Sequence, residues 1–311
     1  MKKDIDLVVV GDSNVDVIIS GLDSLPVLGT EKLATGFDIV MGGSSTIFAC
    51  GAAKLGLKTG FIGKLGDDGY GKIVMSTLKK YKVDTSAIVI DPKIKTGVTI
   101  SLTYPNDRAF LTYLGSISDF KLNDIDYNYI NRARHMHLSA FFLQTGLQRD
   151  VPNLFKRVKK MGLTTSFDTG FDPEEKWDSG VYNVLKNTDI FLPNEIESTA
   201  LSKKSEPEAA LDVLVKYVNI AAIKLGSKGS IAMDNKMNKV NRNSHKIKVV
   251  DTTGAGDSFN AGFIYGFLNG KDIGACLEYG NACGALSAMR IGGATSCPSI
   301  NEVKLFMNSS K

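Results

Sequence analysis

The second half of this chain alternates short apolar segments with longer amphipathic ones, and this alternation most constrains the fold. Strand-like segments are expected at 135–139, 164–168, 189–192, 221–225, 231–233 and 246–250. Helix-like segments are expected at 147–161, 181–185, 195–201, 207–217, 255–268 and 273–289. Strands that alternate with helices form a mostly parallel sheet covered on both faces. The sequence therefore predicts an α/β sandwich of three layers.

Extra strands interrupt this alternation in the first part of the chain. An apolar strand is expected at 5–10, a helix at 47–55, a strand at 59–64, a helix ending near 81 and a strand at 88–90. Further strands are expected at 15–19 and 33–40, and at 98–104 and 109–113 around the turn sequence Pro105-Asn106-Asp107-Arg108. We expect residues 1–311 to form a single domain. The segments at about 15–40 and 96–114 would add a small β-strand lid.

Composition excludes several classes of protein. Hydrophobic residues make up 43% and charged residues 23% of the 311 residues, a balance typical of soluble globular proteins. The net charge is only +4 without a Lys/Arg block, which argues against nucleic acid as a partner. No apolar segment approaches the ~20 residues that cross a membrane. Acids at positions 4 and 6 disfavour a signal peptide, so a cytoplasmic location is expected.

Cysteine and histidine spacing gives no sign of a metal or redox site. The four cysteines contain no C-x-x-C pair, and the three histidines have no ligand spacing. We expect the cysteines to be buried free thiols.

The segment Val250-Asp251-Thr252-Thr253-Gly254-Ala255-Gly256-Asp257 reads as the end of a strand, a glycine turn and the start of a helix. The first amides of a helix lack partners within it, and the helix dipole adds positive potential there, so such a turn attracts anions. Asp257 lies among these amides, where it would remain ionised and accept a proton from a substrate hydroxyl. This combination indicates phosphoryl transfer.

Other polar features follow predicted strands, and the carboxyl ends of parallel strands share one edge of a sheet. They are Asn14 with Asp16, Gly42 with Gly43, Asp168 with Asp172, Asn194 with Glu197, and the segment Lys224-Leu225-Gly226-Ser227. Each has an ordinary structural alternative: Asn14 and Asp16 can close a turn, and the glycine pair can be a plain turn. Asn194 and Glu197 lie three residues apart at a helix start, where they can hold Mg²⁺ or simply cap the helix.

Taken together, these segments resemble the ribokinase-like (PfkB) family of carbohydrate kinases. The residues from Asp251 to Asp257 match the C-terminal signature of that family without a gap, and the segment from Gly42 to Gly56 matches the N-terminal signature in spacing. The segment Gly11-Asp12-Ser13-Asn14-Val15-Asp16 is similar to its sugar-binding start, and Asn194 to Glu197 is similar to its N-x-x-E motif. The match spans nearly the whole chain.

The resemblance implies a ribokinase-like fold, ATP with Mg²⁺ as cofactors, and a role for each matched residue. Asp257 would be the base, and Gly254, Ala255 and Gly256 would form the anion hole. Asn14, Asp16, Gly42 and Gly43 would contact the sugar. Asn194 and Glu197 would organise phosphate and Mg²⁺, the latter through water. Nucleotide-binding positions would be Gly226, Ser227, Gly229 and Asn281. Positions that hold K⁺ in many members correspond to Asp251, Thr253, Ser287, Arg290, Gly292 and Ser296.

Three departures affect the expected substrate. Ile47 replaces a frequent Asn, so a sugar contact is lost or moves to Ser44, Ser45 or Thr46. Lys224 replaces a frequent Thr and can reach a nucleotide phosphate or remain solvated. Arg108, in the lid hairpin, can face a carboxylate or phosphate on the substrate, as in an acidic sugar such as 2-keto-3-deoxygluconate, or be a surface arginine.

The leading hypothesis is an ATP-dependent kinase that phosphorylates a primary hydroxyl of a sugar or sugar acid. One alternative is a nucleoside kinase, with Ile47 and Phe110 against the base. Another is a catalytically silent sugar-binding regulator, against which the intact Gly-Ala-Gly-Asp sequence argues. A dinucleotide oxidoreductase has little support, because G-x-G-x-x-G is missing after the first strand. A homodimer formed through the lid is expected, because exposed strand edges invite pairing.

Overall fold

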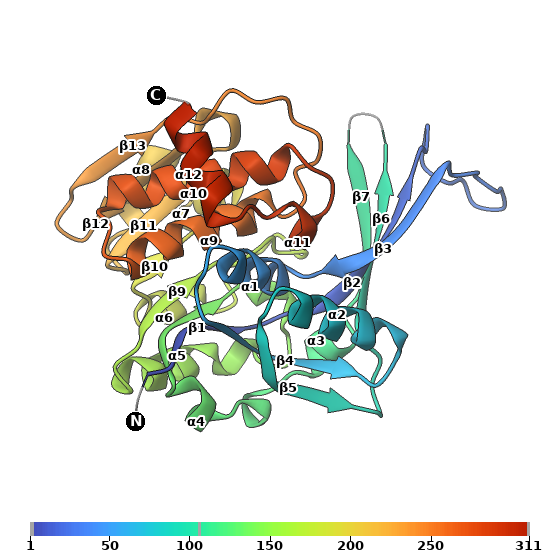
Figure 1. Ribbon diagram of the computed structural model, residues 1–311, viewed down its shortest axis with the longest axis horizontal. Helices are drawn as coiled ribbons and strands as arrows, with labels where there is room; N and C mark the ends of the chain where they lie inside the picture. The colour runs from blue at the N-terminus through green and yellow to red at the C-terminus, as the bar shows by residue number, and fades with distance from the viewer. Residues whose placement is uncertain (1–2, 105–106, 310–311) are drawn as a thin grey trace.

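The computed structural model describes residues 3–104 and 107–309, and its centre is a nine-stranded sheet (Figure 1). In spatial order the strands are Lys239–Arg242 (β13), Ser230–Asp234 (β12), Ile220–Lys224 (β11), Ile190–Phe191 (β10), Thr164–Phe167 (β9), Ala133–Leu138 (β8), Ile5–Val10 (β1), Thr59–Gly66 (β4) and Asp84–Asp91 (β5). All neighbours from β11 to β5 pair in parallel, whereas β12 and β13 are antiparallel. The predicted α/β fold with a mostly parallel sheet is therefore confirmed.

Helices cover both faces of this sheet because its central strands are apolar on both sides. In β1, Val8 and Val10 pack into one buried cluster, while Leu7 and Val9 pack into the other. The first cluster is covered by Tyr127–Ile130 (α4), Val151–Lys160 (α5), Val181–Leu185 (α6), Glu195–Ser202 (α7) and Pro207–Leu214 (α8). The second is covered by Ser44–Lys54 (α1), Gly69–Lys80 (α2), Ala255–Leu268 (α9), Ile273–Ala288 (α10) and Ile300–Ser309 (α12). Two short helices, Ser116–Asp119 (α3) and Gly293–Ser296 (α11), lie in connections.

A second sheet of four strands projects from the main body (Figure 1). We call it the small sheet; its strands are, in spatial order, Gly36–Gly42 (β3), Asn14–Ser20 (β2), Gly97–Thr103 (β6) and Arg108–Tyr113 (β7). Side chains alternate between its two faces, so the strand register fixes which residues share a face. The polar face carries Asp16, Thr99, Thr112 and Arg108, together with Ile18 and Phe110.

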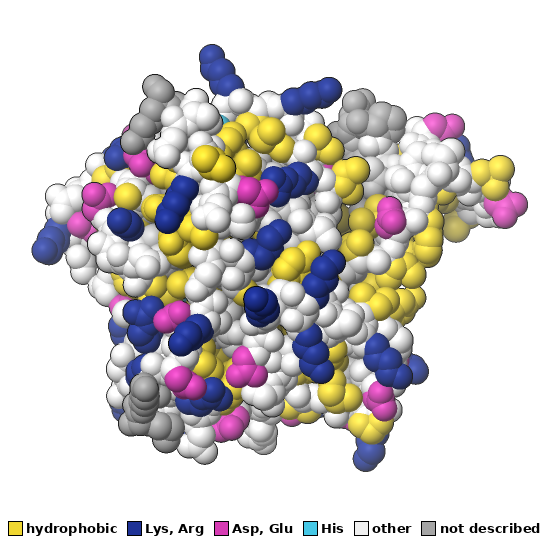
Figure 2. All heavy atoms as spheres, viewed as in Figure 1, with side chains coloured by type: hydrophobic (Ala, Val, Ile, Leu, Met, Phe, Trp, Pro, Cys, Tyr) yellow, Lys and Arg dark blue, Asp and Glu magenta, His cyan; other side chains and the backbone are white. Residues whose placement is uncertain are grey.

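The opposite face of the small sheet is apolar throughout. Three rows run across its four strands: Met41, Val15, Val98 and Tyr113; Ile39, Val17, Ile100 and Leu111; Phe37, Ile19, Leu102 and Ala109. Val15 and Met41, in the row nearest the main body, are buried, whereas Phe37, Ile39, Leu111 and Tyr113 are exposed. Hydrophobic side chains accordingly gather on the small sheet in the space-filling view (Figure 2).

Most predicted elements are present, but one strand is wrong. Residues 246–250, expected as a strand, form none, and Val249 and Val250 are exposed instead. The strand at this edge of the sheet is instead β13, which was not predicted. Strand β3 begins at Gly36 rather than 33. In the predicted 105–108 turn, Pro105 and Asn106 lie outside the described residues.

The prediction of buried free thiols is confirmed. All four cysteines, Cys50, Cys276, Cys283 and Cys297, are buried and free. His135 and His137 are buried and each is hydrogen-bonded to Ser166, which lies between them. Within residues 3–104 and 107–309, no helix has the length and hydropathy needed to cross a bilayer.

Candidate active site

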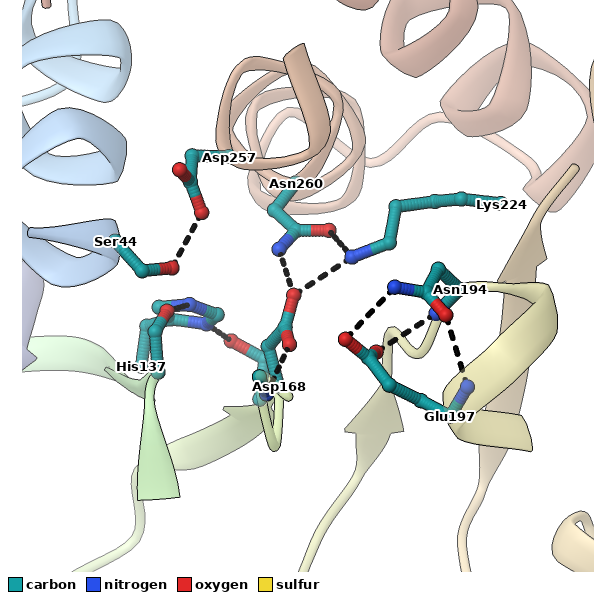
Figure 3. A network of polar contacts seen from close by, with 11 residues as sticks. Ser44, His137, Asp168, Asn194, Glu197, Lys224, Asp257 and Asn260 are labelled. Carbon is teal, nitrogen blue, oxygen red and sulfur yellow. Dashed lines mark hydrogen bonds and ion pairs between the residues drawn. The ribbon is translucent and has the colours of Figure 1, made fainter. Parts of the chain in front are cut away.

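Asp257 lies in the first turn of α9, opposite the first residue of α1. Its carboxylate accepts a short hydrogen bond from the Ser44 hydroxyl, which joins two segments that are 213 residues apart in the chain (Figure 3). Loss of water around the carboxyl raises the pKa of Asp257 to about 8, although Ser44 and the Lys224 ammonium act in the opposite direction. The expectation that the helix N-terminus keeps Asp257 ionised is therefore corrected, because desolvation dominates.

The turn before α9 holds its amides open to a ligand. Ala255 N donates to Thr252 O at 3.2 Å, but within the described chain the amides of Gly254, Gly256 and Asp257 have no hydrogen-bond partner. Gly254 has a φ of 72°, and a Cβ there would lie 2.9 Å from the Ile47 side chain. Ile47 thus packs beneath this turn. The amides of Gly254 and Gly256 are available as an anion hole, whereas that of Ala255 is engaged.

Lys224, at the end of β11, lies beside this turn with its side chain only 13% exposed. Its ammonium forms an ion pair of 2.6 Å with Asp168, at the end of β9, and donates to Asn260 Oδ1 at 3.2 Å. Asn260 Nδ2 in turn donates to Asp168 Oδ2 at 2.5 Å, so the three side chains close a triangle (Figure 3). Burial disfavours both charges, but each stabilises the other, so the pKa of Lys224 is raised and that of Asp168 is lowered. The alternative of a solvated lysine is wrong.

Asn194 and Glu197 form a reciprocal cap at the start of α7. Glu197 N donates to Asn194 Oδ1 at 2.8 Å, while Glu197 accepts from the backbone and side-chain nitrogens of Asn194 at 2.9 and 2.8 Å. Desolvation raises the pKa of the buried Glu197 to about 7. The capping alternative is therefore realised in the structure. Each carboxylate oxygen keeps a lone pair, so the residues also fit a Mg²⁺ ion bound through water.

Polar residues after β1 organise the opposite side of the site. Asn14 Nδ2 donates to Asp16 Oδ1 at 2.9 Å, and a Cβ at Gly42 would lie 2.0 Å from that oxygen, so glycine leaves room for the carboxylate. Gly43, the cap residue of α1, has a φ of 90°. Desolvation raises the pKa of Asp16 to about 6.

Asp12 is a site residue that sequence reasoning missed. Its carboxylate accepts from the amides of Ser44 and Ser45, both at 2.9 Å, and so fixes the start of α1 against β1. No side chain of the Ser44-Ser45-Thr46 segment caps this helix, and the Thr46 hydroxyl donates to the carbonyls of Gly42 and Gly43. A lone Asp after a strand gives no local sign of a partner 32 residues away.

Arg108 reaches from β7 to the turn before α9. Its guanidinium donates to the hydroxyls of Thr252, at 2.9 Å, and Thr253, and lies 3.4 Å from Asp251 Oδ1. Arg108 therefore connects the small sheet to the turn before α9 and is not a free surface arginine.

The positions expected to hold K⁺ fall into two groups. Asp251 Oδ1 accepts from Thr253 N at 2.8 Å, and Asp251 Oδ2 accepts from Gly292 N at 3.0 Å. Ser287 and Ser296 share a hydrogen bond of 2.7 Å between their hydroxyls, and the Arg290 side chain pairs with Glu302. The oxygens fit a monovalent cation in type, but the Asp251 carboxylate already contacts the Arg108 guanidinium.

The residues expected around the nucleotide lie beyond β11. Gly226 and Ser227 belong to a short 3-10 turn, Gly226–Lys228, that follows Lys224. A Cβ at Gly229 would lie 2.1 Å from the carbonyl oxygen of Arg242, and Asn281 Nδ2 donates to the carbonyls of Arg242 and Asn243 at 3.2 Å. Gly229 and Asn281 thus meet the same loop after β13.

Comparison with known proteins agrees with this architecture. Residues 4–300 match the model of the pfkB family carbohydrate kinases. An uncharacterized sugar kinase of Archaeoglobus fulgidus is 34% identical over 248 residues, which cover 80% of this chain and 98% of the relative. A 5-dehydro-2-deoxygluconokinase of Geobacillus thermodenitrificans is 29% identical, with 88% of this chain and 86% of the relative covered.

A solved structure extends the match to three dimensions. A candidate ribokinase II of E. coli, in complex with ATP and Mg²⁺, superposes with a TM-score of 0.87 at 26% identity and covers 98% of this chain and 99% of its own. The family match spans nearly the whole chain, and the turn before α9 and the two-sheet fold agree with it. The chain is therefore a carbohydrate kinase of the pfkB family.

Proposed function

We propose that this kinase transfers the γ-phosphoryl group of ATP to a primary hydroxyl of a sugar or sugar acid. The observation that carries the proposal is the meeting of Asp257 with Ser44, because it brings a base on α9 to the start of α1, where the sugar residues lie. The unpaired amides of Gly254 and Gly256 lie one turn from that carboxylate. A base and an anion hole so close together suit attack of a hydroxyl on phosphorus.

In this proposal the two substrates enter from opposite sides of Asp257. The sugar contacts Asn14, Asp16, Gly42, Gly43 and Ser44, and the nucleotide lies along Asn194, Lys224, Gly226, Ser227, Gly229 and Asn281. Mg²⁺, bound through water near Glu197, would neutralise phosphate charge. K⁺ near Asp251, Thr253, Ser287, Arg290, Gly292 and Ser296 would stabilise the turn before α9. The small sheet serves as a lid over the sugar and, in a homodimer, as the contact between copies.

A sugar acid is the substrate class we favour. The relatives named 5-dehydro-2-deoxygluconokinase have a gluconate derivative as the substrate in their name. In this chain Arg108 lies on the polar face of the small sheet, the face that also carries the sugar residue Asp16. A guanidinium has five donors, and those not bonded to Thr252 and Thr253 remain for a substrate carboxylate.

The test is ADP formation with a panel of hexoses, pentoses, sugar acids and nucleosides. We expect sustained turnover with at least one sugar acid, and Asp257→Asn should abolish turnover while sugar binding, measured by calorimetry, persists. An active Asn variant would refute the assignment of the base. Absence of turnover across the panel would favour a silent regulator, and turnover with nucleosides alone would favour a nucleoside kinase.

A second measurement tests the substrate class. Arg108→Ala should raise KM for sugar acids far more than for neutral sugars, because only the acids have a carboxylate for the guanidinium. Arg108→Lys keeps the charge and should lose less. An equal increase in KM for sugar acids and neutral sugars would mean that Arg108 does not recognise the substrate carboxylate.

A further inference from the structure

We infer that Lys224 is a catalytic residue whose ammonium donates to the transferred phosphoryl group, and that Asp168 and Asn260 are positioning residues for it. The inference rests on the proposed function and deepens it. The proposed function places Lys224 along the nucleotide, and the inference adds that its ammonium contacts the γ-phosphoryl group during transfer. Three observations carry it. The ammonium is held by two acceptors, it lies next to the anion hole, and the ion pair of Lys224 with Asp168 is too little exposed to water to add much stability to the fold.

The Lys224 ammonium is held from two directions. Asp168 accepts at 2.6 Å from the end of β9, and Asn260 accepts at 3.2 Å from α9. Asp168 is itself held by two further hydrogen bonds. Its Oδ1 accepts from Gly170 N at 2.9 Å, and its Oδ2, which accepts from Lys224, also accepts from Asn260 Nδ2 at 2.5 Å. A lysine with four rotatable bonds is therefore confined to one position before any substrate binds, as preorganised stabilisation requires.

That position borders the anion hole. A Cβ added at Gly256 would lie 3.8 Å from Lys224 Nζ, so the ammonium is the neighbour of the turn that carries the unpaired amides. Asn260, which accepts from the ammonium, follows Asp257 by one helical turn, so the base and one anchor of the cation lie on the same helix. An ammonium has three donors, and Asp168 and Asn260 use two of them. The third donor remains for an oxygen of the phosphoryl group.

Stability alone does not explain this arrangement. The side chains of Lys224 and Asp168 are only 13% and 6% exposed, and withdrawing two charges from water costs about as much as their attraction returns. The site also contains the carboxyl groups of Asp257 and Glu197, which both favour a charged Lys224. A triphosphate that enters next to these groups needs a cation already in place.

In the transfer step the acceptor hydroxyl oxygen forms a bond to the γ-phosphorus, and its proton passes to Asp257. The bond between phosphorus and the β,γ-bridging oxygen breaks, and ADP leaves with the electron pair. Lys224 stays protonated throughout and donates its third hydrogen to a non-bridging oxygen, where negative charge is concentrated in the transition state.

The first test compares Lys224→Met with the wild type. We expect kcat to fall about 10²–10³-fold, the usual loss for one anion-stabilising donor, with KM for the sugar changed less than about threefold. Ethylammonium added to Lys224→Ala should restore part of kcat in a concentration-dependent way. The rising limb of the pH–rate profile should move to higher pH in Lys224→Met, because the lysine charge favours ionised Asp257.

The second test separates catalysis from charge neutralisation of Asp168. Lys224→Met leaves a buried Asp168 charge without its partner, which destabilises the fold and lowers activity without any catalytic role of the lysine. Asp168→Asn/Lys224→Met removes both charges and restores neutrality. We expect the double variant to melt near the wild type and to remain as slow as Lys224→Met. If it recovers wild-type kcat, Lys224 only neutralises Asp168 and the inference is overturned.

The outcomes for the wild type and its variants separate the two proposals. Turnover by the wild type with kcat of Lys224→Met within about threefold of it overturns the inference and leaves the proposed function intact. Absence of phosphoryl transfer by the wild type to every acceptor in the panel overturns both. A slow, folded double variant with rescue of Lys224→Ala by ethylammonium supports both.

Discussion

Asp257 experiences two opposing electrostatic effects, and if it is the base, as we propose, the balance between them sets the pH range of the enzyme. The helix N-terminus, Ser44 and Lys224 favour its ionised form, whereas the loss of water and the nearby carboxylates of Asp168 and Asp12 favour the protonated form. Because the second group dominates, the pKa of Asp257 rises to about 8. A base with a pKa near the working pH is well suited to accept a proton during transfer.

The pH dependence of kcat/KM should report this group directly. Only ionised Asp257 can accept the hydroxyl proton, so kcat/KM should rise about tenfold per pH unit below its pKa of about 8 and level off above it. Ser44→Ala removes a hydrogen bond to the ionised form and should move the limb to higher pH. Ser44→Thr keeps the hydroxyl and should leave the limb in place. A limb unmoved in Ser44→Ala would mean that Ser44 does not influence the base.

Asp257 should also reduce the stability of the substrate-free protein at alkaline pH. Its folded-state pKa, about 8, exceeds the unfolded value of about 3.9, so the protonated carboxyl stabilises the fold at low pH and this stability is lost as pH rises through 8. Asn does not titrate. The melting temperature of Asp257→Asn should therefore exceed that of the wild type by an amount that grows from pH 5 to about pH 8 and levels off above it.

A surface acid provides the control for this measurement. Asp4 accepts a hydrogen bond of 2.8 Å from Arg132, which lowers its pKa, so its carboxylate is ionised in both the folded and the unfolded chain from pH 5 to pH 9. Asp4→Asn should give no gain that grows with pH. If both variants behave alike, the effect at Asp257 is not a consequence of burial.

At the scale of elements, Arg108 links β7 of the small sheet to the turn before α9. The Asp251 carboxylate forms an ion pair with the Arg108 guanidinium and also belongs to the proposed K⁺ site. Both cations would therefore interact with the same carboxylate. We therefore expect KCl, compared with choline chloride, to stimulate Arg108→Met more than the wild type. Arg108→Lys keeps a cation and should resemble the wild type. Equal stimulation of all three proteins would mean that Arg108 and K⁺ act independently.

The sequence predicted those elements whose determinants are local. Strand β1 is apolar on both faces, and Asp68 caps α2 by accepting from Gly71 N, three residues further along the chain. The predicted strand at 246–250 was wrong because alternation of Lys with apolar residues shows strand propensity but not whether a partner strand exists. Val250 N instead bonds to Ala288 O, at the end of α10.

The site shows the same division between local and distant determinants. The turn from Asp251 to Asp257 and the pair Asn194 with Glu197 were found because each lies within a few residues of sequence. The partners of Lys224 were not found, because Asp168 and Asn260 are 56 and 36 residues away. The pKa of Asp257 likewise depends on desolvation by residues from several elements, which no local pattern contains.

At the scale of the whole molecule, the small sheet is incompletely covered. Val15 and Met41 of its apolar face pack into the main body, but Phe37, Ile39, Leu111 and Tyr113 on the same face are exposed. Exposed apolar faces of this kind usually mark an interface. Since the register places three complete apolar rows on this face, a second copy of the chain could bury it symmetrically.

We therefore expect a homodimer that dissociates when charge is placed on the apolar face. Ile39→Lys/Leu111→Lys should sediment as a monomer of about 34 kDa at micromolar concentration, whereas Asp38→Lys, on the polar face of the same strand, should remain dimeric. A wild type that is monomeric under these conditions would contradict the proposal. Because Asp16 and Arg108 lie on the other face of the same sheet, the monomeric variant should also show a raised KM for the sugar with a smaller change in kcat. This combined result would connect assembly to substrate binding through a single sheet.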